Sequence, residues 1–106
     1  MARTLLTVPS SAKPGEVIEI RTLIGHPMET GYRPDSEGKI QLRNIIRRFV
    51  CRYNGETVFS AELFPAISAN PYLAFYLRAT ETAPLTFTWE GDNGFSQSET
   101  AALKVV

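Results

Sequence analysis

The stretch NIIRRFVCRYNGETVFSAEL, residues Asn44 to Leu63, has the pattern of two antiparallel strands joined by a tight turn. Apolar and polar residues alternate on both sides of Asn54-Gly55, and a period of two is typical of half-buried strands. The pair Asn54-Gly55 favours a type I′ turn, because both residues tolerate a positive φ. We therefore predict a β-hairpin. The residues expected on its buried face are Ile45, Phe49, Cys51, Tyr53, Phe59, Ala61 and Leu63.

The same alternation recurs along the rest of the chain, between turn signals spaced about ten residues apart. VIEIRTLI (17–24) and LTFTWE (85–90) are the clearest further strands, and GDNG (91–94) reads as a second turn. The residues expected to point inward are Ile18, Ile20, Ile24, Leu85, Phe87 and Trp89. We predict an all-β, immunoglobulin-like antiparallel β-sandwich of about seven strands, with residues 1–106 as a single domain. An antibody-type domain is not implied, because the Cys–Trp–Cys pattern is missing.

The composition argues against two classes of partner. Of the 106 residues, 11 are Lys or Arg and 11 are Asp or Glu, so the formal net charge is zero. Nucleic-acid binders usually carry a basic surplus, and polybasic membrane anchors require one. No apolar run reaches the length of a membrane span or a signal peptide. We therefore expect neither nucleic acid nor membrane as a partner.

The longest irregular stretch, Gly25 to Arg43, contains the only histidine, within GHPMETG. A loop of this length in a small domain is usually functional or mobile. A blue-copper site needs two histidines and a thiolate, and structural zinc needs four ligands, so one histidine is too few for either. Calcium at Asp35 and Glu37 is less expected than two solvated turn acids, because the spacing is not that of an EF-hand. We therefore predict no metal and no cofactor.

A Cys51–His26 pair is the one route to an enzyme that the residue inventory leaves open. A nucleophilic thiol needs a base within hydrogen-bond reach and usually some exposure. Alternation places Cys51 on the apolar face, where a thiol is inert. His26 is expected to be a partly exposed loop residue that bonds a nearby carbonyl, with a role in orienting a ligand as the functional alternative.

The segment SANPYLAFYLRA (68–79) has apolar residues on both faces of its expected strand. Leu73, Phe75 and Leu77 share one face, and Tyr72, Ala74 and Tyr76 the other. Such a strand is covered on both sides. A loop of the same chain or a partner protein could supply the second cover, and both remain open, since Tyr and Arg are enriched at interfaces.

Three motifs stand in a fixed order along the chain: HPMETG (26–31), NPYLAFY (70–76) and FTWEGDNG (87–94). Together they resemble the SoxZ family of bacterial thiosulfate oxidation, and the resemblance runs from about Lys13 to the C-terminus. It implies an immunoglobulin-like fold and a heterodimer with a Y subunit. The C-terminal Gly-Gly-Cys-Gly-Gly arm of that subunit carries the sulfur substrate covalently, and other sulfur-oxidation enzymes contact the carrier transiently.

The resemblance also implies where the chemistry resides. This chain ends in SETAALKVV, with no cysteine and no glycine arm, so it is expected to be the non-catalytic Z subunit. It is expected in the periplasm, co-exported with the Y subunit, which carries the export signal.

Two hypotheses concern particular residues. The partner-binding residues are predicted to be His26, Met28, Tyr32, Arg33, Tyr72, Tyr76 and Arg78. A second hypothesis places His26, Arg33 or Arg43 beside the anionic sulfur adduct of the arm, because guanidinium donors suit sulfonate oxygens. The alternatives to a carrier subunit are a small Cys51/His26 enzyme and a generic immunoglobulin-like interaction module.

Overall fold

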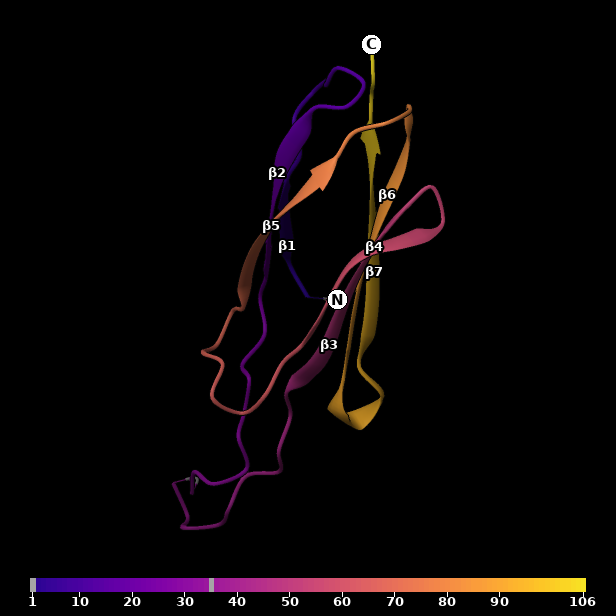
Figure 1. Ribbon diagram of the computed structural model, residues 1–106. Coiled ribbons are helices and arrows are strands. Elements are labelled where there is room, and N and C mark those ends of the chain that lie inside the picture. Colours follow the sequence, from indigo (N-terminus) through magenta and orange to yellow (C-terminus); the bar gives the residue numbers. More distant parts are fainter. Residues whose placement is uncertain (1, 35) are drawn as a thin grey trace.

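The computed structural model describes residues 2–34 and 36–106 and is built almost entirely of β-strands (Figure 1). The strands are β1 (Thr4–Thr7), β2 (Val17–Ile24), β3 (Ile46–Tyr53), β4 (Glu56–Glu62), β5 (Tyr72–Arg78), β6 (Ala83–Gly91) and β7 (Ser96–Leu103), with one 3-10 turn, η1 (Asp92–Gly94). The predicted all-β, immunoglobulin-like sandwich is confirmed. The calcium hypothesis rests partly on Asp35, which lies outside the described residues.

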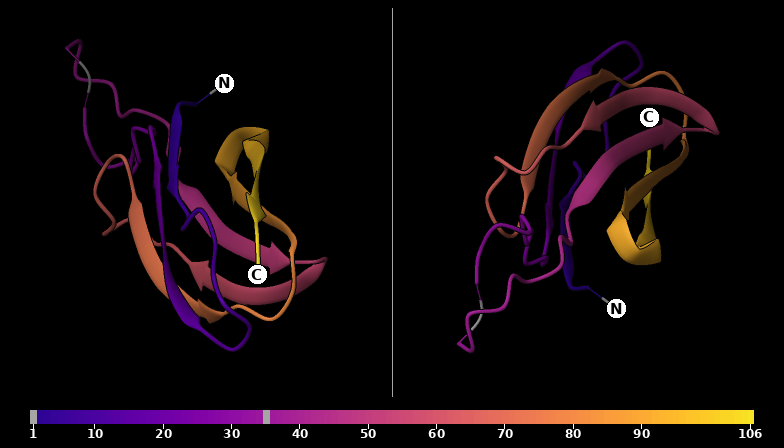
Figure 2. Two further views of the ribbon diagram at one scale, coloured as in Figure 1. Left: turned by 90° about the horizontal axis from the view of Figure 1, so that it is seen from above. Right: turned by 90° about the horizontal axis from the view of Figure 1, so that it is seen from below.

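The strands form two antiparallel sheets. One has the order β1-β2-β5 and the other β4-β3-β6-β7. The two sheets lie against each other as layers, and the segment between β2 and β3 extends beyond them at one end (Figures 1 and 2). This extension gives the molecule an elongated shape, 57 × 20 × 19 Å.

The hairpin predicted from Asn54-Gly55 is present. Asn54 has φ 51° and Gly55 has φ 82°, as a type I′ turn requires. Tyr53 pairs with Glu56 directly across it. β3 is a central strand, because β6 pairs with its other side.

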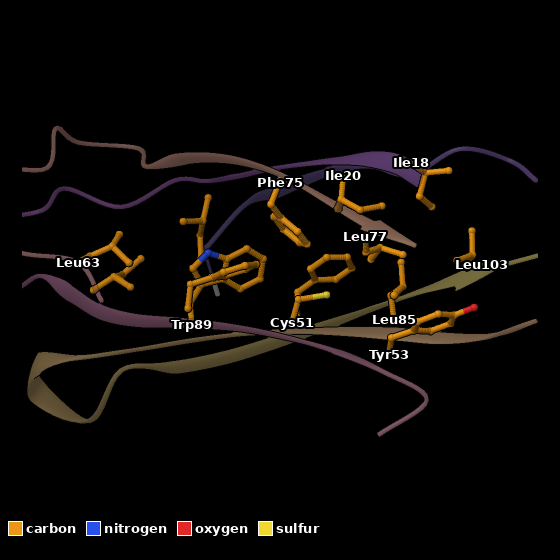
Figure 3. Packing of buried hydrophobic residues seen from close by; sticks show 14 of the residues in the cluster. Ile18, Ile20, Cys51, Tyr53, Leu63, Phe75, Leu77, Leu85, Trp89 and Leu103 are labelled. Carbon is orange, nitrogen blue, oxygen red and sulfur yellow. The ribbon is translucent and has the colours of Figure 1, made fainter. Parts of the chain in front are cut away.

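The core fills the space between the two sheets. Every residue predicted to point inward is buried except Phe59 and Ala61, which are half-buried because β4 is an edge strand. Figure 3 shows Cys51 and Trp89 of the four-stranded sheet pointing toward Ile20 and Phe75 of the other. The alternation of β3 and β6 is thus the direct cause of the packed interior.

Gly91 permits a close approach at the end of the β3–β6 pair. It pairs with Ile46, and a Cβ added to Gly91 would overlap the carbonyl oxygen of Ile45. We expect Gly91→Ala to lower the free energy of unfolding by about 1–3 kcal/mol, because backbone atoms must shift to relieve the overlap. Urea denaturation measures this change.

Gly25→Ala is the matched control, because a Cβ there would meet its nearest atom, the Arg3 carbonyl oxygen, at an ordinary 3.6 Å. Its free energy of unfolding should change by less than about 1 kcal/mol. Equal effects of the two substitutions would contradict the assigned role of Gly91.

Candidate partner-binding surface

The outer face of the β1-β2-β5 sheet carries a row of apolar and aromatic side chains. Leu5 of β1 pairs with Leu23 of β2, and Leu23 pairs with Tyr72 of β5. Two and four residues further along β5, Ala74 and Tyr76 stand on the same face, since side chains alternate along a strand. Leu5, Tyr72 and Tyr76 are 62%, 58% and 66% exposed. The cross-strand register therefore assembles one patch from residues far apart in the sequence.

Polar groups on this face are bonded within the chain. The Arg21 guanidinium donates to Glu19 at 2.6 Å, and the Tyr76 hydroxyl donates to the same carboxylate at 3.2 Å. The hydrogen bond from Arg21 holds the pKa of Glu19 below its usual value. The Arg78 guanidinium donates to the Gly15 carbonyl at 2.7 Å. The aromatic rings thus remain open while their polar neighbours already have partners.

No segment of the described chain covers this face, as the exposure of Tyr72 and Tyr76 shows. The sequence allowed two possibilities for what covers this face, a loop of the same chain or a partner protein. For Tyr72 and Tyr76, a loop of the described chain is therefore excluded. Two shallow hollows of about 390 and 210 Å³ share Leu5 and Leu23. The face is a slightly hollowed, partly apolar surface, which is the form of a protein-binding site.

His26 lies at the base of the β2–β3 loop and is only 5% exposed. Its backbone N–H donates to the Asn70 side-chain oxygen at 3.0 Å, and the Asn70 N–H donates to the His26 carbonyl at 2.8 Å. Its ring meets the Phe95 ring edge-on at 5.1 Å. The expectation of a partly exposed histidine is wrong, because the β4–β5 loop and the β6–β7 turn pack against it.

Met28 is held in an unusual conformation beside His26. Its φ is 49°, in the left-handed region, which costs a residue other than glycine about 1–3 kcal/mol. Its N–H donates to His26 Nδ1 at 3.0 Å, and its Sδ accepts the Ile46 N–H at 3.2 Å. The Sδ bond ties the loop to the start of β3, whereas the Nδ1 bond lies within the loop. We call His26, Met28, Ile46 and Asn70 the loop anchor.

The two arginines of the second hypothesis are engaged with carboxylates of the chain. Arg33 donates to Glu29 at 2.6 Å, and Arg43 makes two bonds to Asp92, at 2.8 and 2.9 Å. The Arg43 bonds lower the pKa of Asp92. No hydrogen bond joins His26 to either arginine in the described part of the chain, so the three do not form one cluster.

The predicted partner-binding residues fall into two groups. The exposed ones are Tyr32, Arg33, Tyr72, Tyr76 and Arg78, and the buried ones are His26 and Met28. Asn70 and Asp92 were not predicted, although they organise the loop. Both occur in turn-forming stretches, SANP and GDNG, and within two of the motifs that carry the family resemblance, NPYLAFY and FTWEGDNG.

The positions of Cys51 and His26 give little support to a catalytic pair. Cys51 is fully buried, and burial raises the pKa of its thiol to about 12. His26 bonds Met28 and Asn70 rather than this thiol. Residues 2–34 and 36–106 contain no group of three or more His, Cys, Asp or Glu side chains placed to hold a metal. The same residues include no helix long and apolar enough to cross a membrane.

The fold and its open face define an immunoglobulin-like β-sandwich domain with an exposed aromatic sheet surface. The chain belongs to the SoxZ family, because the family model described as "Sulphur oxidation protein SoxZ" matches residues 6–102. No curated protein matches the sequence.

Solved structures of the same fold include a superoxide reductase (neelaredoxin) from Ignicoccus hospitalis. It is 16% identical with a TM-score of 0.77, over 99% of this chain and 82% of that one. The sulfur carrier protein SoxY from Chlorobium limicola f thiosulfatophilum is 13% identical with a TM-score of 0.69, over 97% and 78% of the two chains. A putative superoxide reductase from Thermotoga maritima is 13% identical with a TM-score of 0.74, over 97% and 85%. At these identities the likeness concerns the fold alone.

Proposed function

We propose that the chain is the non-catalytic subunit of a heterodimeric sulfur carrier. It binds a Y subunit whose C-terminal cysteine holds the sulfur intermediates. Membership of the SoxZ family gives the chain a role in sulfur oxidation. The observation that carries the finer proposal is the exposed aromatic face of the β1-β2-β5 sheet, which is available for a second protein to bind. The heterodimer works in the periplasm and is exported by the signal of the Y subunit.

The partner contacts this face through the Tyr72 and Tyr76 rings, with Arg78 beside them. Tyr and Arg are the residues most often found to dominate binding energy at interfaces. The three strands are four, eight and seven residues long. At about 4.8 Å apart they present roughly 300 Å², less than half of the ~800 Å² that each partner usually buries. The interface therefore extends beyond the sheet, and exposed Tyr32 and Arg33 in the adjoining loop belong to it.

Co-expression with the Y subunit tests this function, and Cys51→Ser separates it from the Cys51/His26 enzyme. The variant should co-purify with the Y subunit as the unmodified chain does, and mass spectrometry should find sulfur additions on the Y subunit only. The buried thiol should also react slowly with a thiol reagent in the folded chain, because its pKa is about 12.

Two outcomes would contradict the proposal. One is the absence of a stable complex when the two folded subunits are mixed. The other is loss of turnover in a reconstituted thiosulfate-oxidising system when Cys51→Ser replaces the unmodified chain, which would favour the enzyme.

A further inference from the structure

His26 is a buried titratable group that the proposed carrier function does not use. Its Nδ1 accepts the Met28 N–H at 3.0 Å, and a ring nitrogen can accept only when it bears no proton. A doubly protonated imidazolium has an N–H on both nitrogens. The hydrogen bond at the base of the loop therefore requires the neutral ring.

The surroundings of His26 favour this neutral ring near pH 7. Burial lowers its pKa from the ordinary value of 6.5, and the charge of Asp92 in η1 acts in the opposite direction. Arg43 and Arg47 bind that carboxylate, at 2.8 and 3.4 Å, and so offset part of its charge. The residues that touch His26 from the β4–β5 loop and the β6–β7 turn, Asn70 and Phe95, are uncharged.

The group that depends on this bond is itself strained. Two hydrogen bonds hold Met28 itself in the left-handed region, its N–H bond to His26 and the bond from the Ile46 N–H to its Sδ. The next residue, Glu29, is paired with Asn44 through two backbone bonds, so the part of the loop that depends on His26 is the turn at Met28. Removing one restraint lets the backbone of Met28 relax toward a more common conformation. The bond at Nδ1 is present or absent according to the protonation of one ring, and a local change of this kind is the basis of a pH switch.

We propose that protonation of His26 releases Met28 from the loop anchor, so that the base of the β2–β3 loop is held in place at neutral pH and loosens in acid. The inference concerns the loop alone and stands whether or not the Y subunit binds there. The direction of the pH dependence follows from the burial of the His26 ring. The folded-state pKa lies below the unfolded value, so the stability that His26 contributes is complete above about pH 6.5. It is lost as the pH falls from there through the folded-state pKa.

Amide hydrogen exchange of the full chain, measured by NMR from about pH 8 to about pH 5 and corrected for intrinsic rates, tests this release. The protection of the Met28 amide should fall by up to about tenfold for each pH unit between about pH 6.5 and the folded-state pKa of His26, and it should level off below that pKa. The amide of Phe87, in a core strand, should keep its protection over the same range. The ring nitrogens of His26 should show a proton on Nε2 alone at neutral pH.

His26→Asn is the matched variant, because its side-chain oxygen replaces Nδ1 as an acceptor and does not titrate in this range. Its Met28 protection should not change with pH. Protection of Met28 that stays constant in the unmodified chain would overturn the proposal, as would an Nδ1–H tautomer of His26 at neutral pH. A fall of Met28 protection in parallel with Phe87 would also overturn it, because the whole fold would then be opening. These three results need no variant, so poor folding of His26→Asn would not leave the proposal untested.

Discussion

Phe49→Ala is expected to lower the free energy of unfolding by about 3–5 kcal/mol, a large part of the ~5–15 kcal/mol that holds a domain of this size together. Phe49 is fully buried in β3, and its ring contacts four others. The four rings are those of Phe59, Phe75, Phe87 and Trp89, with centroids 5.3–6.3 Å away. Phe75 belongs to the opposite sheet, so the substitution opens a cavity between the two layers. Urea denaturation followed by tryptophan fluorescence measures the loss.

Phe64→Ala is the control for this substitution, because the Phe64 side chain is exposed in the loop that follows β4. It should change the free energy of unfolding by about 0.5 kcal/mol or less. A cost below about 1 kcal/mol for Phe49→Ala would show that the interior collapses around the cavity. The two sheets would then pack less rigidly than the ring contacts indicate.

Tyr76→Glu is expected to dissociate the proposed heterodimer. The substitution places a carboxylate in the exposed patch, next to Glu19, which already accepts the Tyr76 hydroxyl bond. Loss of the aromatic ring and burial of an unpaired charge should weaken binding by at least ~2 kcal/mol, or about thirtyfold. Gel filtration of the co-expressed subunits should then show two separate peaks.

Val58→Glu provides the matched control, because Val58 is an exposed apolar residue on edge strand β4 of the other sheet. It introduces the same charge away from the patch and should leave the heterodimer intact. Circular dichroism should show that both variants remain folded. An unchanged elution profile for Tyr76→Glu would move the partner interface away from this face. Dissociation of both variants to the same extent would mean that charge alone, and not the patch, governs the complex.

Much of the fold could be predicted because the governing signals are local. In β3 and β6, the residues predicted to face inward, among them Phe49, Cys51, Leu85 and Trp89, are buried. Val50, on the opposite face of β3, is buried as well, which alternation did not predict. The Asn54-Gly55 turn sets the register of its hairpin. The prediction was less accurate for β4, whose inward residues are only half-buried. Alternation tells which side a residue faces, but it does not tell whether a strand lies at the centre or the edge of a sheet.

The candidate surface was predicted only in part. The shared face of Tyr72 and Tyr76 follows from alternation within one strand, whereas their apolar neighbours Leu5 and Leu23 come from strands about 70 and 50 residues away in the chain. No pattern within β5 could have identified those neighbours. Sheet order assembles the patch, and sheet order is a property of the complete fold.

By itself, the sequence determined the strands and the faces of their side chains, because both follow from apolar residues at every second position. It also determined the tight turn and the lack of enough histidines for a metal site, because these depend only on which residues are present. The environment of His26 depended on tertiary structure alone. Asn70 and Phe95, 44 and 69 positions further along the chain, close over it and bury it. Burial and hydrogen bonding depend on which segments meet in space. Here they bury a loop histidine that was expected to be partly exposed, and they give it a hydrogen bond that requires the neutral ring.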